Sequence, residues 1–317
     1  LLAKLFVFTF YLLFIHCNSF RFRLFIRLCL KVIYCIDRVT PFALMKGFRL
    51  AGSRDGVKPI VVLEGSWSIA EGSYLSSLEF DNIEFRHEAN NNYFMNTSKA
   101  YTIENVSFVN CDFISLRRGF WRHQSANAKY IMNLEMEGCR FEGCGWQTSA
   151  YGAFNLQSFD KDNGVSYDQV DRAIFRNCTF SNDNDGTNGY GWGNLFYAPY
   201  MDKPIDLEYK NVTIYNYSRN QRLINIESAV GSKLVMEGIL LASPCGDLFA
   251  IGANTTTTFS NNYTTADYTL GGKNMNATDL KITAAELFAD PANGDLTIKD
   301  TSSPIVSNRA GDTRWLP

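Results

Sequence analysis

The chain has 317 residues, of which 46% are hydrophobic and 20% are charged, and its formal net charge is −2. This composition is far from that of a disordered chain, and a near-neutral charge without a long basic run argues against a dedicated nucleic-acid binder. Phe, Tyr and Gly are abundant, with 24, 16 and 23 residues. Such a composition favours β-structure with many turns over an all-helical fold.

The first 45 residues differ from the rest of the chain. They contain no Gly, and their six basic residues and one acidic residue give them a net charge of +5, which leaves −7 for residues 46–317. Lys4 and the apolar run 5–15 resemble the start of a secretory signal peptide. Three interpretations of residues 1–45 stay open: a degraded signal or anchor, a mistranslated stretch, and an amphipathic helix on a membrane surface. In each case residues 1–45 are a doubtful leader, and the prediction of the fold rests on residues 46–317.

A ten-residue pattern recurs along the body of the chain. It alternates apolar and other residues and carries Asn or Gly at its fifth position. Its six copies begin at Leu78, Tyr101, Leu134, Ala173, Leu207 and Leu234. Alternation with period two indicates β-strands, and recurrence every 23 to 39 residues indicates a stacked-repeat architecture.

The fifth position of the pattern predicts a corner, because Asn and Gly tolerate a left-handed backbone. The predicted corner residues are Asn82, Asn105, Gly138, Asn177, Asn211 and Gly238. A large apolar residue follows three positions later, and stacking of the repeats about 4.8 Å apart would bury these side chains as a ladder. The predicted aromatic ladder consists of Phe85, Phe108, Phe141 and Phe180.

A second apolar patch follows each copy and predicts a third strand in every repeat. These patches lie at Phe94, Phe120–Trp121, Phe154, Leu195–Phe196, Leu223–Ile226 and Leu248–Ile251. Three strands per repeat predict an all-β solenoid, a parallel β-helix of about eight coils over residues 46–265. Residues 266–317 are expected to close the solenoid, with Leu296, Ile298 and Trp315 covering the exposed core of the last coil.

The cysteines and histidines predict no metal site, because none has the spacing of zinc ligands. Cys139 and Cys178 are expected in one inward column and Cys111 and Cys144 in another, as small buried side chains. Whether cysteines of adjacent repeats form disulfides stays open. His123 is isolated in the sequence and is expected in a solvated loop.

Two insertions, Gln157–Asp171 and Asn182–Trp192, lengthen adjacent repeats and are rich in Asp, Asn, Gly and Tyr. We expect them on one side of the stack, as walls of a groove. Aromatic faces bury the apolar surface of sugar rings while polar groups bind the hydroxyls, so the groove predicts a glycan-binding site within residues 144–200. Its candidate residues are Trp146, Tyr151, Tyr167, Tyr190, Trp192 and Tyr197. The alternative is that these aromatic side chains pack the insertions themselves.

The pattern gives less support to catalysis. Asp183 and Asp185 could supply the two carboxylates that a glycosidase needs, and Arg122 could bind the carboxylate of a uronic acid or assist a lyase. The acidic turns at 160–164 and 183–186 place carboxylates two residues apart before Gly, as some calcium loops do. Neither turn has the full ligand set of an EF-hand, so calcium is the only cofactor that the sequence leaves open.

The coil pattern resembles the right-handed parallel β-helix of the pectin-lyase-like superfamily. Residues 287–298 (LFADPANGDLTI) and the ending 303–315 resemble the closing segment of uncharacterised secreted or surface proteins, domains of unknown function, from polysaccharide-degrading bacteria. The resemblance implies an extracytoplasmic, carbohydrate-associated role. It transfers no catalytic residues, because the calcium residues of pectate lyases and the polygalacturonase motif series do not occur in the sequence.

The sequence therefore predicts a secreted or cell-surface β-helix protein that binds polysaccharide or oligosaccharide. A polysaccharide lyase or glycoside hydrolase acting on an acidic glycan such as pectin is the first alternative, and a structural or adhesin protein is the second. We expect a monomer that binds no nucleic acid, and association with an outer membrane or cell surface stays open.

Overall fold

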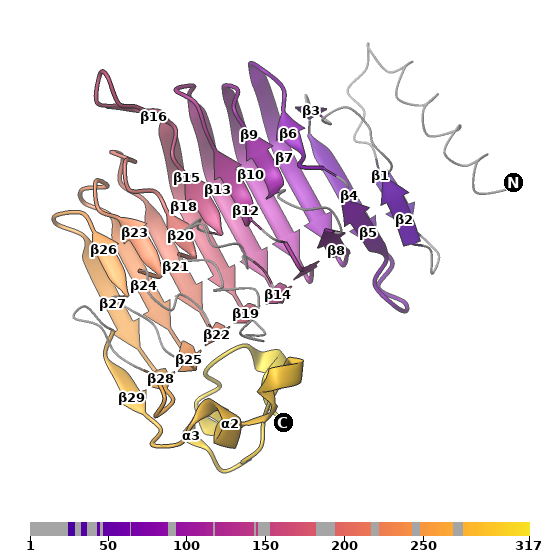
Figure 1. Cartoon of the computed structure of the whole chain (residues 1–317), viewed down its shortest axis with the longest axis vertical. Helices are drawn as coiled ribbons and strands as arrows, with labels where there is room; N and C mark the ends of the chain where they lie inside the picture. The colour runs from indigo at the N-terminus through magenta and orange to yellow at the C-terminus, as the bar shows by residue number, and fades with distance from the viewer. Residues whose placement is uncertain are drawn as a thin grey trace, which may run out of the picture.

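The computed structural model describes residues 25–28, 33–36, 43–44, 47–63, 65–87, 93–116, 118–142, 144, 153–181, 194–216, 222–242, 248–268 and 275–317. Within these residues the fold is all-β and is built on three long parallel sheets, which appear in Figure 1 as rows of arrows running in the same direction. The chain visits the three sheets in turn, and most passes add one strand to each.

Sheet 1 has nine described strands in chain order: β1 (Phe25–Leu28), β4 (Phe48–Gly52), β7 (Ser73–Asp81), β10 (Tyr101–Val109), β13 (Lys129–Glu137), β18 (Asp168–Arg176), β21 (Asp206–Lys210), β24 (Lys233–Glu237) and β27 (Thr256–Ser260). Its four long strands, β7 to β18, have nine residues each. This long stretch of strands gives sheet 1 a broad outer face.

Sheet 2 follows sheet 1 in each repeat. Its ten described strands are β2 (Ile33–Ile36), β5 (Ile60–Leu63), β8 (Glu84–His87), β11 (Asp112–Ile114), β14 (Arg140–Glu142), β19 (Thr179–Ser181), β22 (Thr213–Tyr215), β25 (Leu240–Ala242), β28 (Asn262–Thr264) and β29 (Ala277–Asp279). The short parallel pair β3 (Ala43–Leu44) and β6 (Ser68–Ile69) lies beside the three sheets. The strands β1, β2 and β3 pair with β4, β5 and β6, so the described sheets include strands that precede residue 46.

Sheet 3 is formed by the second apolar patches of the sequence, as predicted. Its six described strands are β9 (Tyr93–Thr97), β12 (Gly119–His123), β15 (Phe154–Leu156), β20 (Phe196–Tyr197), β23 (Ile224–Ile226) and β26 (Phe249–Ile251). An antiparallel hairpin of β16 (Phe159–Asp160) and β17 (Val165–Ser166) follows β15.

The corner between sheets 1 and 2 is made by single left-handed residues. Five predicted corner residues have φ angles between 48° and 66°, namely Asn82, Gly138, Asn177, Asn211 and Gly238. In the repeat that begins at Tyr101 the corner is Asn110, with a φ of 50°, and its amide donates to Asn82 Oδ1 over 2.7 Å. The αL region costs less for Asn and Gly than for other residues, which explains why these two types recur.

The prediction that Asn105 is a corner residue is wrong. Phe108 pairs with Phe80 and Met136 on the neighbouring strands, so this copy of the pattern begins five residues later than predicted. Asn105 is exposed within β10, where it accepts a hydrogen bond from Asn133. Both halves of this long strand alternate with period two, so alternation alone could not fix its register.

The core contains ladders of stacked rings. Phe113, not Phe108, joins the predicted ladder of Phe85, Phe141 and Phe180, with successive ring centroids 5.4, 4.7 and 4.7 Å apart. Phe108 stacks on Phe80 at 4.8 Å in a separate ladder. Each such contact adds about 0.5–1.5 kcal/mol to the free energy gained by burial of the rings.

The C-terminal segment, residues 275–317, adds β29 to the end of sheet 2. The rest of the segment lies beside that sheet, as the yellow ribbon next to β22, β25 and β28 shows (Figure 1). After β29 it contains α2 (Ala284–Leu287), β30 (Phe288–Asp290), the 3₁₀ turn η1 (Pro291–Asn293), β31 (Asp295–Ile298), α3 (Pro304–Ser307) and the 3₁₀ turn η2 (Thr313–Trp315). No helix in the described part of the chain is long and apolar enough to cross a membrane.

The expected cap over the last coil is therefore wrong for the three residues named for it. Leu296 and Ile298 are buried in a second, smaller core with outward-facing side chains of sheet 2, such as Leu240 and Tyr263. Trp315 packs against that smaller core and donates to Thr179 Oγ1 of β19 over 2.7 Å, several strands away from the end of the stack. The outer side of β25 and β28 is apolar, and this surface draws the segment to the side of the sheet.

Candidate functional site

Two of the predicted groove residues, Tyr167 and Tyr197, lie in the described part of the chain. The catalytic candidate Arg122 also lies there. The remaining predicted groove and catalytic residues lie outside it: Trp146, Tyr151, Asp183, Asp185, Tyr190 and Trp192. Tyr167 stands at the base of the β16–β17 hairpin, where its backbone N–H donates to Ser158 and its carbonyl accepts from Lys129.

The two insertions stand in different connections between the sheets. Residues 182–193 lie outside the described part of the chain, so the groove that the insertions are expected to form stays a prediction. Gln157–Asp171 follows β15 and leads from sheet 3 to sheet 1, whereas Asn182–Trp192 connects β19 to β20 and so leads from sheet 2 to sheet 3. Because the strands of sheet 3 are parallel, one insertion attaches at their carboxyl end and the other at their amino end. The outer face of sheet 3 lies between the two points of attachment.

A row of polar and aromatic residues crosses that outer face. In register on four neighbouring strands it contains Arg122, Asn155, Tyr197 and Asn225, and we call it the sheet-3 row. The residues on either side of Asn155 are in the core, so the alternation of the strand turns Asn155 outward. Asn155 and Asn225 are buried, whereas Arg122 and Tyr197 are partly exposed.

Tyr197 lies in a polar and aromatic environment. Burial is the main cause that raises the pKa of its phenol, and nearby Tyr200 and Glu227 act in the same direction while Arg222 opposes them. The ring of Tyr200 stacks on Phe159 of the hairpin, with centroids 4.3 Å apart. A hydroxyl, aromatic faces and two charged groups therefore meet around Tyr197 in the sheet-3 row. We call this group the Tyr197 surface; it consists of Phe159, Tyr197, Tyr200, Arg222 and Glu227.

Arg122 is held against an aromatic ring at the other end of the row. Its guanidinium carbon lies 5.4 Å from the centroid of the Tyr93 ring, and that of Arg118 lies 6.0 Å from the same centroid. These distances are typical of cation–π contacts. The planar guanidinium of Arg122 can bind a carboxylate or two sugar hydroxyls at this place.

In the acidic turn at residues 160–164, the Asp160 carboxylate is hydrogen-bonded within the turn itself. Asp160 accepts from the backbone N–H groups of Asp162 and Asn163 over 2.9 and 3.2 Å and from the Asn163 amide over 2.7 Å. These bonds lower the pKa of the Asp160 carboxyl. The arrangement is an Asx turn at the hairpin tip, and in the described ranges no group of three or more His, Cys, Asp or Glu side chains is placed to hold a metal.

His123 is fully buried, so the prediction that it lies in a solvated loop is wrong. Its Nδ1 lies 2.6 Å from Asp168 Oδ1 and its Nε2 lies 2.5 Å from the hydroxyl of Tyr101. Asp168 Oδ2 also accepts from the backbone N–H of Ser158. Because Nε2 faces Tyr101 and not a serine hydroxyl, the group lacks the nucleophile–base contact of a catalytic triad.

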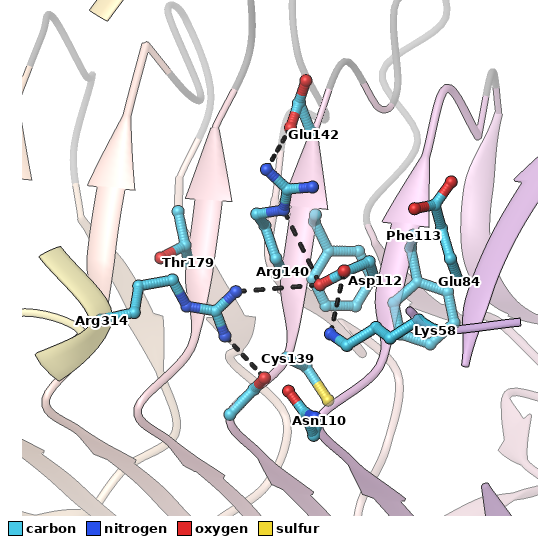
Figure 2. Close-up of polar contacts among 12 residues, drawn as sticks. Lys58, Glu84, Asn110, Asp112, Phe113, Cys139, Arg140, Glu142, Thr179 and Arg314 are labelled. Atoms are coloured by element: carbon cyan, nitrogen blue, oxygen red, sulfur yellow. Dashed lines mark hydrogen bonds and ion pairs between the residues drawn. The ribbon is translucent and has the colours of Figure 1, made fainter. Parts of the chain in front are cut away.

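A carboxylate and several bases converge on the outer face of sheet 2 (Figure 2). Asp112 of β11 lies 2.9 Å from the Lys58 amine and 3.7 Å from both the Arg140 and the Arg314 guanidinium groups. Sequence reasoning missed this cluster, because Arg314 comes from the C-terminal segment and reaches back over many repeats. In the same view Arg314 also donates to the carbonyl of Gly138 over 2.6 Å.

The charges of this cluster are balanced within the protein. Arg140 has a second partner in Glu142 at 2.8 Å, and Arg314 has one in Asp312 at 2.8 Å. The side chain of Asp112 is only 10% exposed. The cluster therefore attaches the C-terminal segment to sheet 2, and its bases are already engaged by carboxylates of the chain itself.

The thiols also differ from the prediction in one position. Cys111, Cys139 and Cys178 follow the corner residues of three successive repeats and form one buried column, since their following residues pair in register. Cys144 is buried elsewhere, and its thiol donates to the carbonyl of Phe113. Among the described residues, none of these four thiols forms a disulfide with another.

Comparisons of the chain with family models, with curated proteins and with solved structures find no match. The function of the protein is therefore inferred from its own surfaces.

Proposed function

We propose that the three parallel sheets form a right-handed parallel β-helix. The proposal is supported by the regular visiting order of the sheets and by the left-handed Asn or Gly at each corner between sheets 1 and 2. Connections between parallel strands of one sheet are right-handed in nearly all proteins. The pectin-lyase-like resemblance of the coil pattern agrees with this hand.

We further propose that the protein binds polysaccharide along the sheet-3 row and the Tyr197 surface, outside the cytoplasm on a secreted or surface-attached molecule. The observation that carries the proposal is the position of Tyr197, partly exposed and in register with Asn155 and Asn225. Parallel strands repeat their side chains about every 4.8 Å. The two partly exposed groups of the row, the guanidinium of Arg122 and the phenol of Tyr197, lie two strands apart, and such a spacing suits a polymer of similar units.

A lyase or hydrolase acting on an acidic glycan is the second candidate, and the position of Arg122 in the same row favours it. A guanidinium held over the Tyr93 ring is suited to binding a uronate carboxylate. In the described residues, the carboxylate-and-base cluster around Asp112 lies on sheet 2 and holds the C-terminal segment. Binding therefore receives more support than catalysis.

Affinity electrophoresis of the full chain tests the proposal. The gels contain polygalacturonate, xylan or hydroxyethylcellulose, and the variants are Tyr197→Ala, Arg122→Ala and, as a control, Val57→Ala, whose side chain is exposed in a loop between β4 and β5. We expect at least one polymer to retard the protein and its control, and Tyr197→Ala to migrate faster. Equal mobility with and without every polymer would contradict glycan binding. Unsaturated products from polygalacturonate, lost in Arg122→Ala, would support the lyase.

A further inference from the structure

A second tyrosine arrangement lies on the outer face of sheet 1, away from the sheet-3 row. Tyr74 of β7 pairs with Thr102 of β10, and Thr102 pairs with Tyr130 of β13. The two tyrosines therefore occupy the same position on strands that are two steps apart. Since neighbouring strands are about 4.8 Å apart, their side chains start about 10 Å from each other.

Both tyrosines make the same diagonal hydrogen bond. Tyr74 donates to Glu104 and Tyr130 donates to Asp171. Each acceptor lies two residues beyond the direct partner of its tyrosine, Thr102 in one case and Gln169 in the other. The structure thus holds two copies of one tyrosine–carboxylate unit, repeated along the axis of the stack.

The units keep their phenol groups protonated. The hydrogen bond to Glu104 is the main cause that raises the pKa of Tyr74, and the bond to Asp171 raises that of Tyr130 to about 12. The tyrosines thus remain neutral donors at physiological pH, and each carboxylate fixes the direction of its ring. Tyr74 is 57% exposed, one of the few large apolar side chains of the described residues that are this accessible.

We propose that Tyr74 and Tyr130 form a second polysaccharide site that takes a neutral, extended, β-linked glycan. Aromatic faces bury the apolar C–H surface of sugar rings. In an extended β-1,4-linked chain every second sugar presents the same face, and two sugars span about the same length as two steps of the sheet. The paired tyrosines therefore match alternate sugars of one chain.

The carboxylates decide the class of glycan. Glu104 accepts from Tyr74, and Asp171 accepts from Tyr130 at one oxygen and from the Gln169 amide at the other over 2.8 Å. The remaining lone pairs of these carboxylates can accept hydrogen bonds from sugar hydroxyls. Two carboxylates on one patch repel a polymer of uronic acids. The site therefore selects a neutral glycan, and it does so independently of Arg122 and the Tyr197 surface.

Calorimetric titration of the full chain tests this site. The ligands are the hexaoses and bioses of neutral β-1,4-linked glucose, xylose and mannose, with hexagalacturonate as the acidic control ligand. The target variants are Tyr74→Ala and Tyr130→Ala, Tyr197→Ala removes the other proposed site, and Val57→Ala is the control. Because the two target side chains lie on the outer face of the sheet, their replacement leaves the core intact, and thermal melting verifies this.

We expect one neutral hexaose to bind more tightly than its biose, because only the longer ligand reaches both rings. Tyr74→Ala and Tyr130→Ala should each weaken hexaose binding about tenfold, whereas Val57→Ala should not change it. Hexaose binding that both target variants retain in full, failure of every neutral hexaose to bind, or tighter binding of hexagalacturonate at these tyrosines would overturn the proposal. If only Tyr197→Ala lost glycan binding, the result would overturn the site at Tyr74 and Tyr130 and would support glycan binding at the sheet-3 row.

Discussion

The guanidinium of Arg314 lies 3.7 Å from the carboxylate of Asp112, although the two residues belong to the last turn of the chain and to an early strand of sheet 2. This ion pair is the last in a series of contacts that the C-terminal segment makes across neighbouring strands of sheet 2. Asn308 donates to the Tyr263 hydroxyl, Gly311 to the carbonyl of Gly238, and the backbone N–H of Asp312 to Thr213 Oγ1. The C-terminal segment thus fastens successive repeats together from outside.

Replacing Arg314 by Ala should destabilise the protein by about 2 kcal/mol, because it leaves Asp112 and the Gly138 carbonyl without one of their partners in a partly buried site. The matched control is Arg172→Ala, which removes an exposed pair with Glu135 at 3.6 Å and should cost at most about 1 kcal/mol. Urea unfolding measures both. Equal midpoints for the two variants would show that the C-terminal contacts add nothing to stability.

Asn110→Ala should lower stability by about 1–2 kcal/mol, whereas Asn105→Ala should cost about 0.5 kcal/mol or less. Asn110 has a φ of 50°, which Ala adopts reluctantly, while Asn105 is exposed within a strand. Asn110→Gly should recover part of the loss, because Gly accepts this conformation freely. The opposite ranking in thermal or urea unfolding would mean that the register of β10 is the one predicted from the sequence.

Phe141→Ala should lower stability by about 3–5 kcal/mol, because it opens a cavity between Phe113 and Phe180 in a ladder with no exposed surface. The control is Val57→Ala, and because Val57 is exposed we expect its replacement to change stability by no more than about 0.5 kcal/mol. Phe141→Asp should prevent folding, since it places an unpaired charge in the core. A soluble Phe141→Asp protein that melts cooperatively would refute the assignment of Phe141 to the core.

The stability of the protein should fall as the pH drops below about 6.5. Burial lowers the pKa of His123 despite the opposing carboxylate of Asp168, so the folded state keeps the ring neutral where the unfolded chain, with an ordinary pKa of about 6.5, takes up a proton. Unfolding thus binds a proton in the window between the lowered folded value and 6.5, and acid favours it. His123→Phe should be less stable at neutral pH but should lose this part of the pH dependence. If the unfolding free energy of His123→Phe changed with pH between 5 and 7 as steeply as that of the unaltered protein, the assignment of this pH dependence to His123 would be wrong.

The main elements of the fold could be predicted because each repeat carries its own local signals. Alternation marked the strands, and Asn82, Gly138, Asn177, Asn211 and Gly238 marked the corners through their backbone preference. The predicted corner at Asn105 was wrong because β10 has nine residues, and apolar residues alternate on both sides of Asn105. In that case the deciding information was the pairing of Phe108 with Phe80, a contact between distant residues.

The candidate sites were less predictable because they depend on which repeats become neighbours. The sequence pointed to Tyr197, because it stands in a stretch that is rich in aromatic and polar residues. It did not reveal the partnership of Tyr74 with Glu104 or of Asp112 with Arg314, because each depends on register or on the path of the C-terminal segment. It also misjudged His123, whose partner Asp168 lies at the start of β18, two strands beyond β10 in sheet 1.

The most direct test of the central claim is a glycan array probed with the full chain and with Tyr197→Ala. The account predicts that the unaltered protein is retained by polysaccharide or oligosaccharide spots and that Tyr197→Ala loses a substantial part of that retention while remaining folded. An array on which the folded protein binds no glycan would contradict a carbohydrate-binding function.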